Sequence, residues 1–576
     1  MQTADLTEEL ARRVAAAAGR TLGVELTPDQ ALIQASPREG VDYQGNLAMS
    51  LGKRLGRPPR EVAEAIAGAL ELGGIADPPE VAGPGFLNFV LRKEWLEAHT
   101  GALLGDPRLG VPETPAPRRI ALDYSGPNVA KEMHVGHLRS SVIGDALVRL
   151  LRFAGHEVLP HNHLGDWGTP FGMLIEHLAD VSAVSAGQRA IADLDAFYRE
   201  ARRKFDSDEA FATRARNRVV LLQSGDEETL AVWQELVDES TRHFDEVYAL
   251  LGISLTHKDI YGESFYNPYL AAVVDDLEKA GLTEVSDGAV CVFPSGFRNR
   301  EGDRLPLIVR KRDGGYGYAA TDLATVRYWT AERGATDLLY VVGAPQAQHF
   351  AMLFAISREA GWLTGTAEHI GFGTVLGADG KTMRTRAGET IKLVDLLTEA
   401  VTQAAAVVAE RSELDASDQR KVAEAVGIGA VKYADLSGDR ERDYVFAWDR
   451  MLAKEGNTSV YLQYAHARTR SILRKAGVTP EGAQVILEAP AERALALKLL
   501  RFGEALKAAT SGYAPHKLCT YLYETAVVFS RFFEECPVLK APSPALRASR
   551  LRLTTLTSRT LALGLSLLGI EAPEQL

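Results

Sequence analysis

The first 110 residues show apolar positions at helical spacing, followed by a short alternating stretch. Leu6, Leu10, Val14 and Ala17 fall on one face of a predicted amphipathic helix, and residues 62–72 predict a second helix. Residues 85–91 alternate as a half-buried strand does. We therefore expect a small α+β domain over residues 1–110. Four prolines within residues 105–119 then indicate a linker.

Residues 116–400 repeat an order of strand, helix and strand that is typical of a parallel α/β sheet. An apolar run at 120–122 leads through turn residues into helical spacing from Leu138 to Leu151, and residues 158–159 predict a second strand. The sheet is expected to resume at residue 305 and again at 337–342. The charged residues of about 185–275 predict a helical insertion between the two halves. Sites in such sheets lie at the carboxyl ends of the strands.

Beyond residue 400 the pattern is helical throughout. Apolar stripes over 455–576 are typical of the core of an all-α bundle. Residues 401–454 are expected to connect that bundle to the preceding domain.

Composition limits the protein class. The chain is 46% hydrophobic and 24% charged, as in ordinary globular proteins, with no apolar run of membrane-spanning length and no signal-peptide core. We expect a cytoplasmic protein without a membrane partner. A net charge of −12 restricts nucleic-acid binding to local basic patches. The three scattered cysteines argue against a disulfide framework and against structural zinc, so no metal site is predicted.

The sequence His134-Val135-Gly136-His137 lies where a loop meets the start of a predicted helix. Free backbone N–H groups and the helix dipole favour phosphate there, and both imidazoles can donate to a polyphosphate. Gly136 lets a flat base approach the backbone closely. The alternatives are a surface histidine pair or half of a metal site. A zinc-hydrolase site with His161, His163 and Asp166 is disfavoured, because no glutamate occupies the expected position of the base.

A second segment with candidate chemistry is the glycine-rich loop 377–388, which carries Lys381, Arg384 and Arg386. Cations on a movable loop can close on pyrophosphate as it departs. The alternative is a basic loop that only faces solvent.

The stretch DYSGPNVAKEMHVGHLRSS resembles the HIGH-motif region of arginyl-tRNA synthetases, a class I aminoacyl-tRNA synthetase family. NHLGDWGTPFG and NTSVYLQYAHAR are similar to further segments of that family, the first lining the active-site mouth and the second opening the anticodon-binding domain. Residues 382–386 occupy the register of the KMSKS loop but lack both lysines. Lys131, just ahead of the HIGH-like motif, stands where it can substitute.

The resemblance implies a multidomain α/β protein. An N-terminal additional domain (1–110) that contacts tRNA precedes a Rossmann-type parallel-sheet catalytic domain (116–400). Connecting strap helices (401–454) and an α-helical anticodon-binding domain (455–576) follow.

The resemblance also implies site residues. Arginine would contact Asp123, Ser125, Asn128, His134, Tyr318, Asp322 and Gln346. ATP would contact His134, Gly136, His137, Lys381, Met383 and Arg384. His134, His137, Lys131 and Lys381 would assist catalysis, and Tyr461, Tyr464, Arg468 and Arg474 would bind tRNA. A guanidinium rewards fixed planar acceptors, which favours Asp322 and Tyr318 for that end; a helix-capping role is the alternative for Asp322.

The function implied is ligation of L-arginine to tRNA(Arg), with ATP and Mg²⁺ but no zinc, by a monomer that needs bound tRNA before it activates arginine. Two rivals stay open. One is a nucleotidyltransferase or ligase with the same histidine motif that acts without RNA. The other is a non-catalytic regulator that only binds tRNA, for which the missing loop lysines are the only indication.

Overall fold

The computed structural model describes residues 5–184, 194–383, 391–409, 415–477 and 482–576. The chain forms two compact units. The first contains Met1–Glu113, Ala453–Ser566 and Glu571–Leu576, and the second contains Thr114–Leu452 and Leu567–Ile570. Among the described residues, no helix has the length and apolar character needed to cross a membrane.

The second unit is built on a four-stranded parallel sheet in the order β11-β10-β5-β6. Its strands are β5 (Arg119–Asp123), β6 (Glu157–His161), β10 (Asp337–Tyr340) and β11 (Thr366–His369). Asp123 at the end of β5 is level with His161 on one side and with Tyr340 on the other. The chain runs from β5 through α5 (Val135–Phe153) to β6 and later returns to the other side of β5. This reversal leaves a crevice beyond the ends of β5 and β10.

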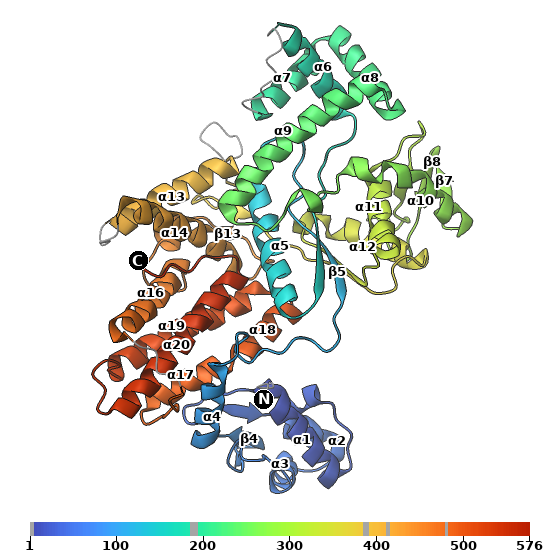
Figure 1. Ribbon diagram of the computed structural model, residues 1–576. Coiled ribbons are helices and arrows are strands. Elements are labelled where there is room, and N and C mark those ends of the chain that lie inside the picture. The colour runs from blue at the N-terminus through green and yellow to red at the C-terminus, as the bar shows by residue number, and fades with distance from the viewer. Residues whose placement is uncertain (1–4, 185–193, 384–390, 410–414, 478–481) are drawn as a thin grey trace. The chain divides into compact units, whose positions relative to one another are not determined.

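Helix α5 packs closely on the strand that precedes it, and β5 lies beside α5 in Figure 1. Tyr124, directly after β5, is fully buried, and a Cβ added to Gly144 of α5 would lie 2.3 Å from the Tyr124 ring. Fourteen residues of α5 are buried, so the helix lies inside the unit rather than on its surface. Helices α6 (Pro170–Val184), α7 (Leu194–Ser207), α8 (Glu209–Ser224) and α9 (Glu227–Leu251) follow β6 along the chain.

One expected strand belongs elsewhere. The apolar run at residue 305 becomes β9 (Leu307–Arg310), which pairs antiparallel with β8 (Ala289–Val292) and not with the parallel sheet. With β7 (Thr283–Ser286) these strands form a separate three-stranded sheet after α10 (Asn267–Lys279). The prediction was wrong because an apolar run does not specify its pairing partner. The segment continues into α11 (Tyr318–Arg327) and a π-helical turn (Tyr328–Glu332) before β10.

The remaining elements of the second unit follow β10. They are α12 (Ala347–Glu359), β12 (Val375–Leu376), α13 (Leu393–Ala409), α14 (Ala416–Leu436), β13 (Tyr444–Val445) and α15 (Trp448–Met451). A buried ion pair joins Arg139 of α5 to Asp435 of α14, at 3.3 Å. Arg139 also donates to the carbonyl of Arg442 at 2.9 Å, so the segment after α14 is held on α5.

The first unit combines both ends of the chain. Its antiparallel sheet has the order β1-β2-β4-β3 and is covered by N-terminal helices. Its elements are α1 (Leu6–Leu22), β1 (Ile33–Ala35), β2 (Tyr43–Gly45), α2 (Leu47–Leu55), α3 (Pro59–Gly68), β3 (Glu80–Ala82), β4 (Phe86–Phe89), α4 (Lys93–Leu103), α16 (Ser459–Ala476), α17 (Pro490–Leu500), α18 (Phe502–Ser511), α19 (Pro515–Glu535) and α20 (Pro544–Leu567).

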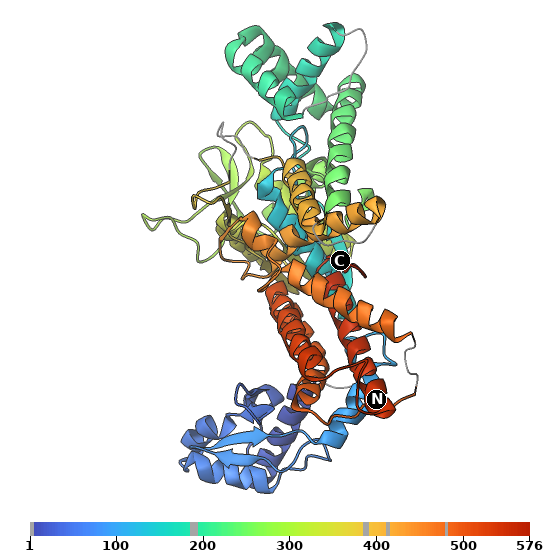
Figure 2. The same ribbon diagram turned by 90° about the vertical axis from the view of Figure 1, so that its left-hand side faces the viewer.

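The N-terminal sheet and the C-terminal helices lie side by side in both views (Figures 1 and 2). Buried Asp42 accepts two hydrogen bonds from Arg493, at 2.8 and 2.7 Å. Next to it, the Tyr43 hydroxyl donates to Glu504 at 2.7 Å. These charge-assisted contacts join segments more than 400 residues apart into one unit.

Candidate functional site

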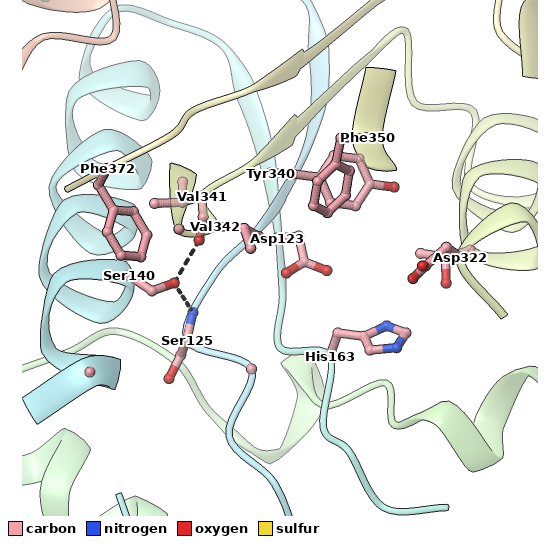
Figure 3. A pocket seen from close by; sticks show the side chains of 14 residues that line it. Asp123, Ser125, Ser140, His163, Asp322, Tyr340, Val341, Val342, Phe350 and Phe372 are labelled. Atoms are coloured by element: carbon pink, nitrogen blue, oxygen red, sulfur yellow. Dashed lines mark hydrogen bonds between the residues drawn. The ribbon is translucent and has the colours of Figure 1, made fainter. Parts of the chain in front are cut away.

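A cavity of about 280 Å³ opens at the crevice between the ends of β5 and β10 (Figure 3). Its walls come from the loop after β5, the start of α5, α11, the end of β10, α12 and the segment after β11. The lining residues are Asp123, Ser125, Gly126, Gly136, Ser140, His163, Asp322, Thr325, Tyr340, Val341, Val342, Gly343, Phe350 and Phe372. The cavity therefore occupies the position where parallel α/β sheets bind their ligands.

Ser140 of α5 ties the two sides of this crevice together. Its hydroxyl accepts from the Ser125 N–H at 2.8 Å and donates to the Val341 carbonyl at 2.7 Å (Figure 3). Ser125 has a φ of 74°, in the left-handed region that a serine rarely adopts. Its own hydroxyl lies 2.8 Å from the buried Tyr248 hydroxyl. These contacts stabilise the unusual turn that forms one wall of the cavity.

The two histidines of the HVGH sequence cap the start of α5. The Gly136 N–H donates to His134 Nδ1 at 3.0 Å, and the His134 N–H donates to His137 Nδ1 at 3.1 Å. Since each Nδ1 accepts, a neutral ring carries its proton on Nε2. A Cβ on Gly136 would lie 2.7 Å from the His134 ring, so the position of that ring requires glycine here. In the neutral form each ring then has an Nε2–H donor, and of the HVGH residues only Gly136 lines the cavity.

Electrostatics favour the neutral form of both rings. Burial lowers the pKa of His137 to about 3, with the neighbouring His134 contributing. Burial also lowers the pKa of His134, and the charge of Lys131 acts in the same direction. At neutral pH the pair therefore offers neutral N–H donors rather than fixed positive charge.

Acidic groups gather at the far side of the cavity. The Asp322 carboxylate accepts from His349 Nε2 at 2.7 Å, and this hydrogen bond raises the pKa of His349. Glu263 lies nearby: burial, with the charges of Asp166 and Asp322, raises its pKa to about 8. Burial is the main cause of this raised pKa, and the neighbouring carboxylates add to it. A carboxyl with a perturbed pKa close to the Asp322 carboxylate is a candidate partner for a cation.

Asp123, at the end of β5, is the second acidic side chain of the cavity lining, after Asp322. Its Oδ2 lies 2.6 Å from His161 Nδ1, and the His163 ring lines the cavity beside it. Asp123, His161 and His163 are also a group whose ligand atoms lie within 4.8 Å of one another, as in some metal sites. In Figure 3 the side chains of Asp123, His163 and Asp322 face a common space.

Other predicted residues lie outside the cavity lining. Asn128 and Gln346 are exposed, and Tyr318 at the start of α11 is 73% exposed. Lys131 Nζ lies 4.5 Å from the Tyr198 ring centroid, on α7. Lys381 is exposed in a tight turn in which the Gly377 N–H donates to its carbonyl. Met383 is half-buried, and Arg384 and Arg386 lie outside the described residues.

The predicted tRNA residues lie together on α16, in the first unit. The Arg468 guanidinium lies 5.1 Å from the Tyr464 ring and 5.5 Å from the Phe533 ring. A groove of about 370 Å³ runs alongside, lined by Arg468, Ser471, Ile472, Lys475, Phe533, Pro537, Val538, Leu539 and Lys540. Tyr461 packs on Tyr523, and Arg474 donates to the Glu574 carbonyl at 3.0 Å. Exposed aromatic rings with cations beside them suit unpaired bases and phosphates.

Two residues of the site were missed from the sequence. Glu263 follows Tyr261-Gly262 near the end of the predicted insertion, and only its proximity to Asp322 marks it. In the sequence, Ser140 cannot be distinguished from the other small residues of the predicted helix. No local signal identifies either, since both act through residues far along the chain.

The sequence matches three family descriptions. "tRNA synthetases class I (R), catalytic domain" covers residues 100–448, "DALR anticodon binding domain" covers 462–576, and "Arginyl tRNA synthetase N terminal domain" covers 5–91. The arginine–tRNA ligase of Thermobifida fusca is 52% identical over 100% of both chains. That of Edwardsiella ictaluri is 49% identical over 97% of both.

Solved structures agree with these matches. The arginyl-tRNA synthetase of Plasmodium falciparum has a TM-score of 0.87 at 28% identity and covers 100% of both chains. That of Thermus thermophilus has a TM-score of 0.82 at 27% identity, over 99% of this chain and 100% of its own. Fold, family matches and relatives agree along the whole length, and the chain belongs to the arginyl-tRNA synthetase family of class I.

Proposed function

We propose that this protein ligates L-arginine to tRNA(Arg) with the energy of ATP. The observation that carries the proposal is the cavity at the switch point of the sheet, which has carboxylates on one side and the start of α5 on the other. The acidic side suits a guanidinium and an ammonium, and the helix start suits a polyphosphate. An amino acid and a nucleotide would meet between them.

The guanidinium of arginine would lie against Asp322, with Glu263 beside it. Asp322 offers a carboxylate oriented by His349, and Glu263 would ionise when a cation approaches. Tyr318 would close over the guanidinium from the start of α11. The α-amino and α-carboxylate groups would then lie toward Asp123, Ser125, Asn128 and Gln346.

Two neutral histidines would contact the phosphates of ATP. The Nε2–H groups of His134 and His137 are directed by the contacts of their Nδ1 atoms to the backbone. Such preoriented donors need little rearrangement as charge shifts onto the departing pyrophosphate. Lys131 and Lys381 would supply positive charge there, with Gly136, Met383 and Arg384 bordering the nucleotide. The carboxylate of arginine would attack the α-phosphate in line, giving arginyl-adenylate and pyrophosphate.

Arginine would then pass from the adenylate to a ribose hydroxyl of the terminal adenosine of tRNA. The anticodon would bind at α16, where Tyr461, Tyr464, Arg468 and Arg474 combine aromatic surface with positive charge. We also propose that bound tRNA is needed before arginine is activated.

The same proposal includes ATP as its magnesium complex, no zinc requirement, a monomeric chain and a place in the cytoplasm. Light scattering of the purified protein tests the monomer directly. Full activity after treatment with a zinc chelator in excess magnesium would support the metal assignment.

Aminoacylation tests the function. Purified protein, ATP, magnesium and total tRNA are incubated with each radiolabelled amino acid in turn, and acid-precipitable label is counted. We expect label from arginine alone. The Asp322→Asn variant should raise the KM for arginine on the order of a hundredfold, because a buried cation would lose its charged partner. Charging with a different amino acid would refute the assignment of the carboxylates.

A further inference from the structure

His161 ends β6 directly beside Asp123, but it is not part of the cavity wall. It is 1% exposed, whereas Asp123 lines the cavity. The distance from His161 Nδ1 to Asp123 Oδ2 is 2.6 Å. An ionised carboxylate only accepts hydrogen bonds, so the imidazole donates from Nδ1. His161 can therefore affect the cavity only through its hydrogen bond to Asp123.

A chain of buried groups determines which nitrogen of His161 carries the proton. Trp329 Nε1 donates to the Tyr266 hydroxyl at 3.1 Å, because an indole N–H can only donate. The Tyr266 hydroxyl lies 3.3 Å from His161 Nε2 and can donate to it when the ring carries its proton on Nδ1. A ring that accepts at Nε2 carries its proton at Nδ1. The chain Trp329, Tyr266, His161 therefore directs an N–H at Asp123.

The residues around His161 restrict the orientation of its ring as well as the position of its proton. Its centroid lies 5.2 Å from that of Trp329, 5.6 Å from that of Tyr261 and 5.3 Å from that of His163. Both ring nitrogens have partners, and the aromatic neighbours leave little room for the ring to turn. A buried hydrogen-bond chain in which every member is satisfied is rigid.

We propose that His161 is a positioning residue for arginine: it holds one oxygen of Asp123 and leaves the other directed at the α-ammonium group of the substrate. This rests on the proposed function of the cavity. The proposed function assigns the guanidinium to Asp322, with Glu263 beside it. Asp123 is the other acidic side chain of the cavity lining and is left for the second positive charge. An oriented carboxylate binds an ammonium more tightly than one that must be ordered on binding.

A transition-metal site formed by Asp123, His161 and His163 is the rival explanation. A metal on Nδ1 would require His161 to give up its hydrogen bond to Asp123 and to carry its proton on Nε2, next to the Tyr266 hydroxyl. The observed contacts favour the hydrogen bond. The metal site is an outcome of the experiment below, and it would overturn the proposal.

Two matched substitutions of His161 distinguish the role of Nδ1 from that of Nε2. The amide nitrogen of His161→Asn can take the place of Nδ1 and still donate to Asp123, whereas the longer side chain of His161→Gln places its amide near Nε2 and loses that donor. We expect the KM for arginine to rise roughly tenfold in His161→Gln and to stay within about threefold in His161→Asn, the difference of one charge-assisted hydrogen bond. The KM for ATP and kcat should change little in both.

Argininic acid, in which a hydroxyl replaces the α-amino group of arginine, serves as the control ligand that lacks the α-ammonium group. Its inhibition constant should be equal in wild type and His161→Gln, because it has no ammonium for Asp123 to hold. An equal loss for arginine and argininic acid would overturn the proposal, as would an unchanged KM for arginine in His161→Gln. So would stoichiometric Zn²⁺ binding to the wild type that His161→Gln abolishes.

Tyr266→Phe keeps the ring and removes only the hydroxyl, so the proposal can be tested with it even if His161→Gln fails to fold. It should raise the KM for arginine by a smaller factor than His161→Gln and leave the inhibition constant of argininic acid unchanged. No change in the KM for arginine would overturn the proposal. If wild type charges no arginine at all, the proposed function itself fails, which these comparisons distinguish from failure of the positioning role.

Discussion

Ser140 donates a hydrogen bond to the carbonyl of Val341 at 2.7 Å and so joins the start of α5 to the end of β10. The same hydroxyl accepts from the Ser125 N–H, in a turn with unusual backbone geometry. Ser140→Ala would leave both buried partners unsatisfied. We expect it to lower the free energy of unfolding by about 1–3 kcal/mol and to raise the KM for arginine, as measured by denaturant unfolding and steady-state charging.

Ser511→Ala is the control for that substitution. The Ser511 hydroxyl donates to the Lys507 carbonyl at an exposed position of α18, so its loss should change neither quantity appreciably. Equal effects of the two substitutions would contradict the role given to Ser140.

The contact between α5 and β5 depends on the absence of a side chain at Gly144. A Cβ there would lie 2.3 Å from the fully buried ring of Tyr124. Gly144→Ala should therefore destabilise the protein by about 1–3 kcal/mol or more, because tightly packed cores tolerate little added volume. Thermal unfolding measures this. Gly68→Ala, in a helix where an added Cβ meets nothing within 4 Å, should be neutral or slightly stabilising; similar melting temperatures for both variants would refute this packing argument.

Glu263 predicts a pH dependence of arginine binding. Its pKa of about 8 keeps it largely protonated at pH 7 in the free protein, and an arriving guanidinium would lower that pKa. Binding should therefore release protons near pH 7, and affinity should increase as the pH rises toward 8 and then level off. Calorimetry in buffers of different ionisation enthalpy measures the release. Glu263→Gln should abolish it; a wild-type protein without release would contradict the assignment.

The sequence was most informative where function is concentrated in consecutive residues. The turn after β5 and the HVGH helix start were predicted because turn residues and helical spacing are local signals. The pairing of β9 with β8 was not predictable, because an apolar run predicts a strand but not the strand with which it pairs. The ion pair of Asp42 with Arg493 spans 451 positions and has no local sign. Glu263 and the orienting role of His161 likewise depend on residues that only the fold brings near.

Substitution of the HVGH histidines separates an enzyme from a protein that only binds tRNA. His134→Ala with His137→Ala removes both Nε2–H donors, so turnover should fall by a hundredfold or more, on the order of the loss of single oxyanion donors, while tRNA affinity is retained. Charging assays and filter binding measure the two quantities. Loss of tRNA affinity together with activity would indicate a folding defect instead.

The pH dependence of stability tests the environment of the same pair. The unfolded His137 binds a proton near its ordinary pKa of 6.5, but the folded one only near 3. Its contribution to stability is therefore complete above pH 6.5 and is lost as the pH falls toward 3. Urea unfolding between pH 7 and 4 should show a smaller pH slope in His137→Asn than in the wild type. Identical slopes would contradict the lowered pKa.

Exchange of labelled pyrophosphate into ATP tests the central claim most directly, because it reports the formation of the adenylate alone. The reaction is run with each of the twenty amino acids, with and without total tRNA. We predict exchange with arginine only, and only when tRNA is present. Exchange that depends on another amino acid, or no exchange from folded protein that still binds tRNA, would contradict an arginine-activating site between the acidic side of the cavity and the start of α5.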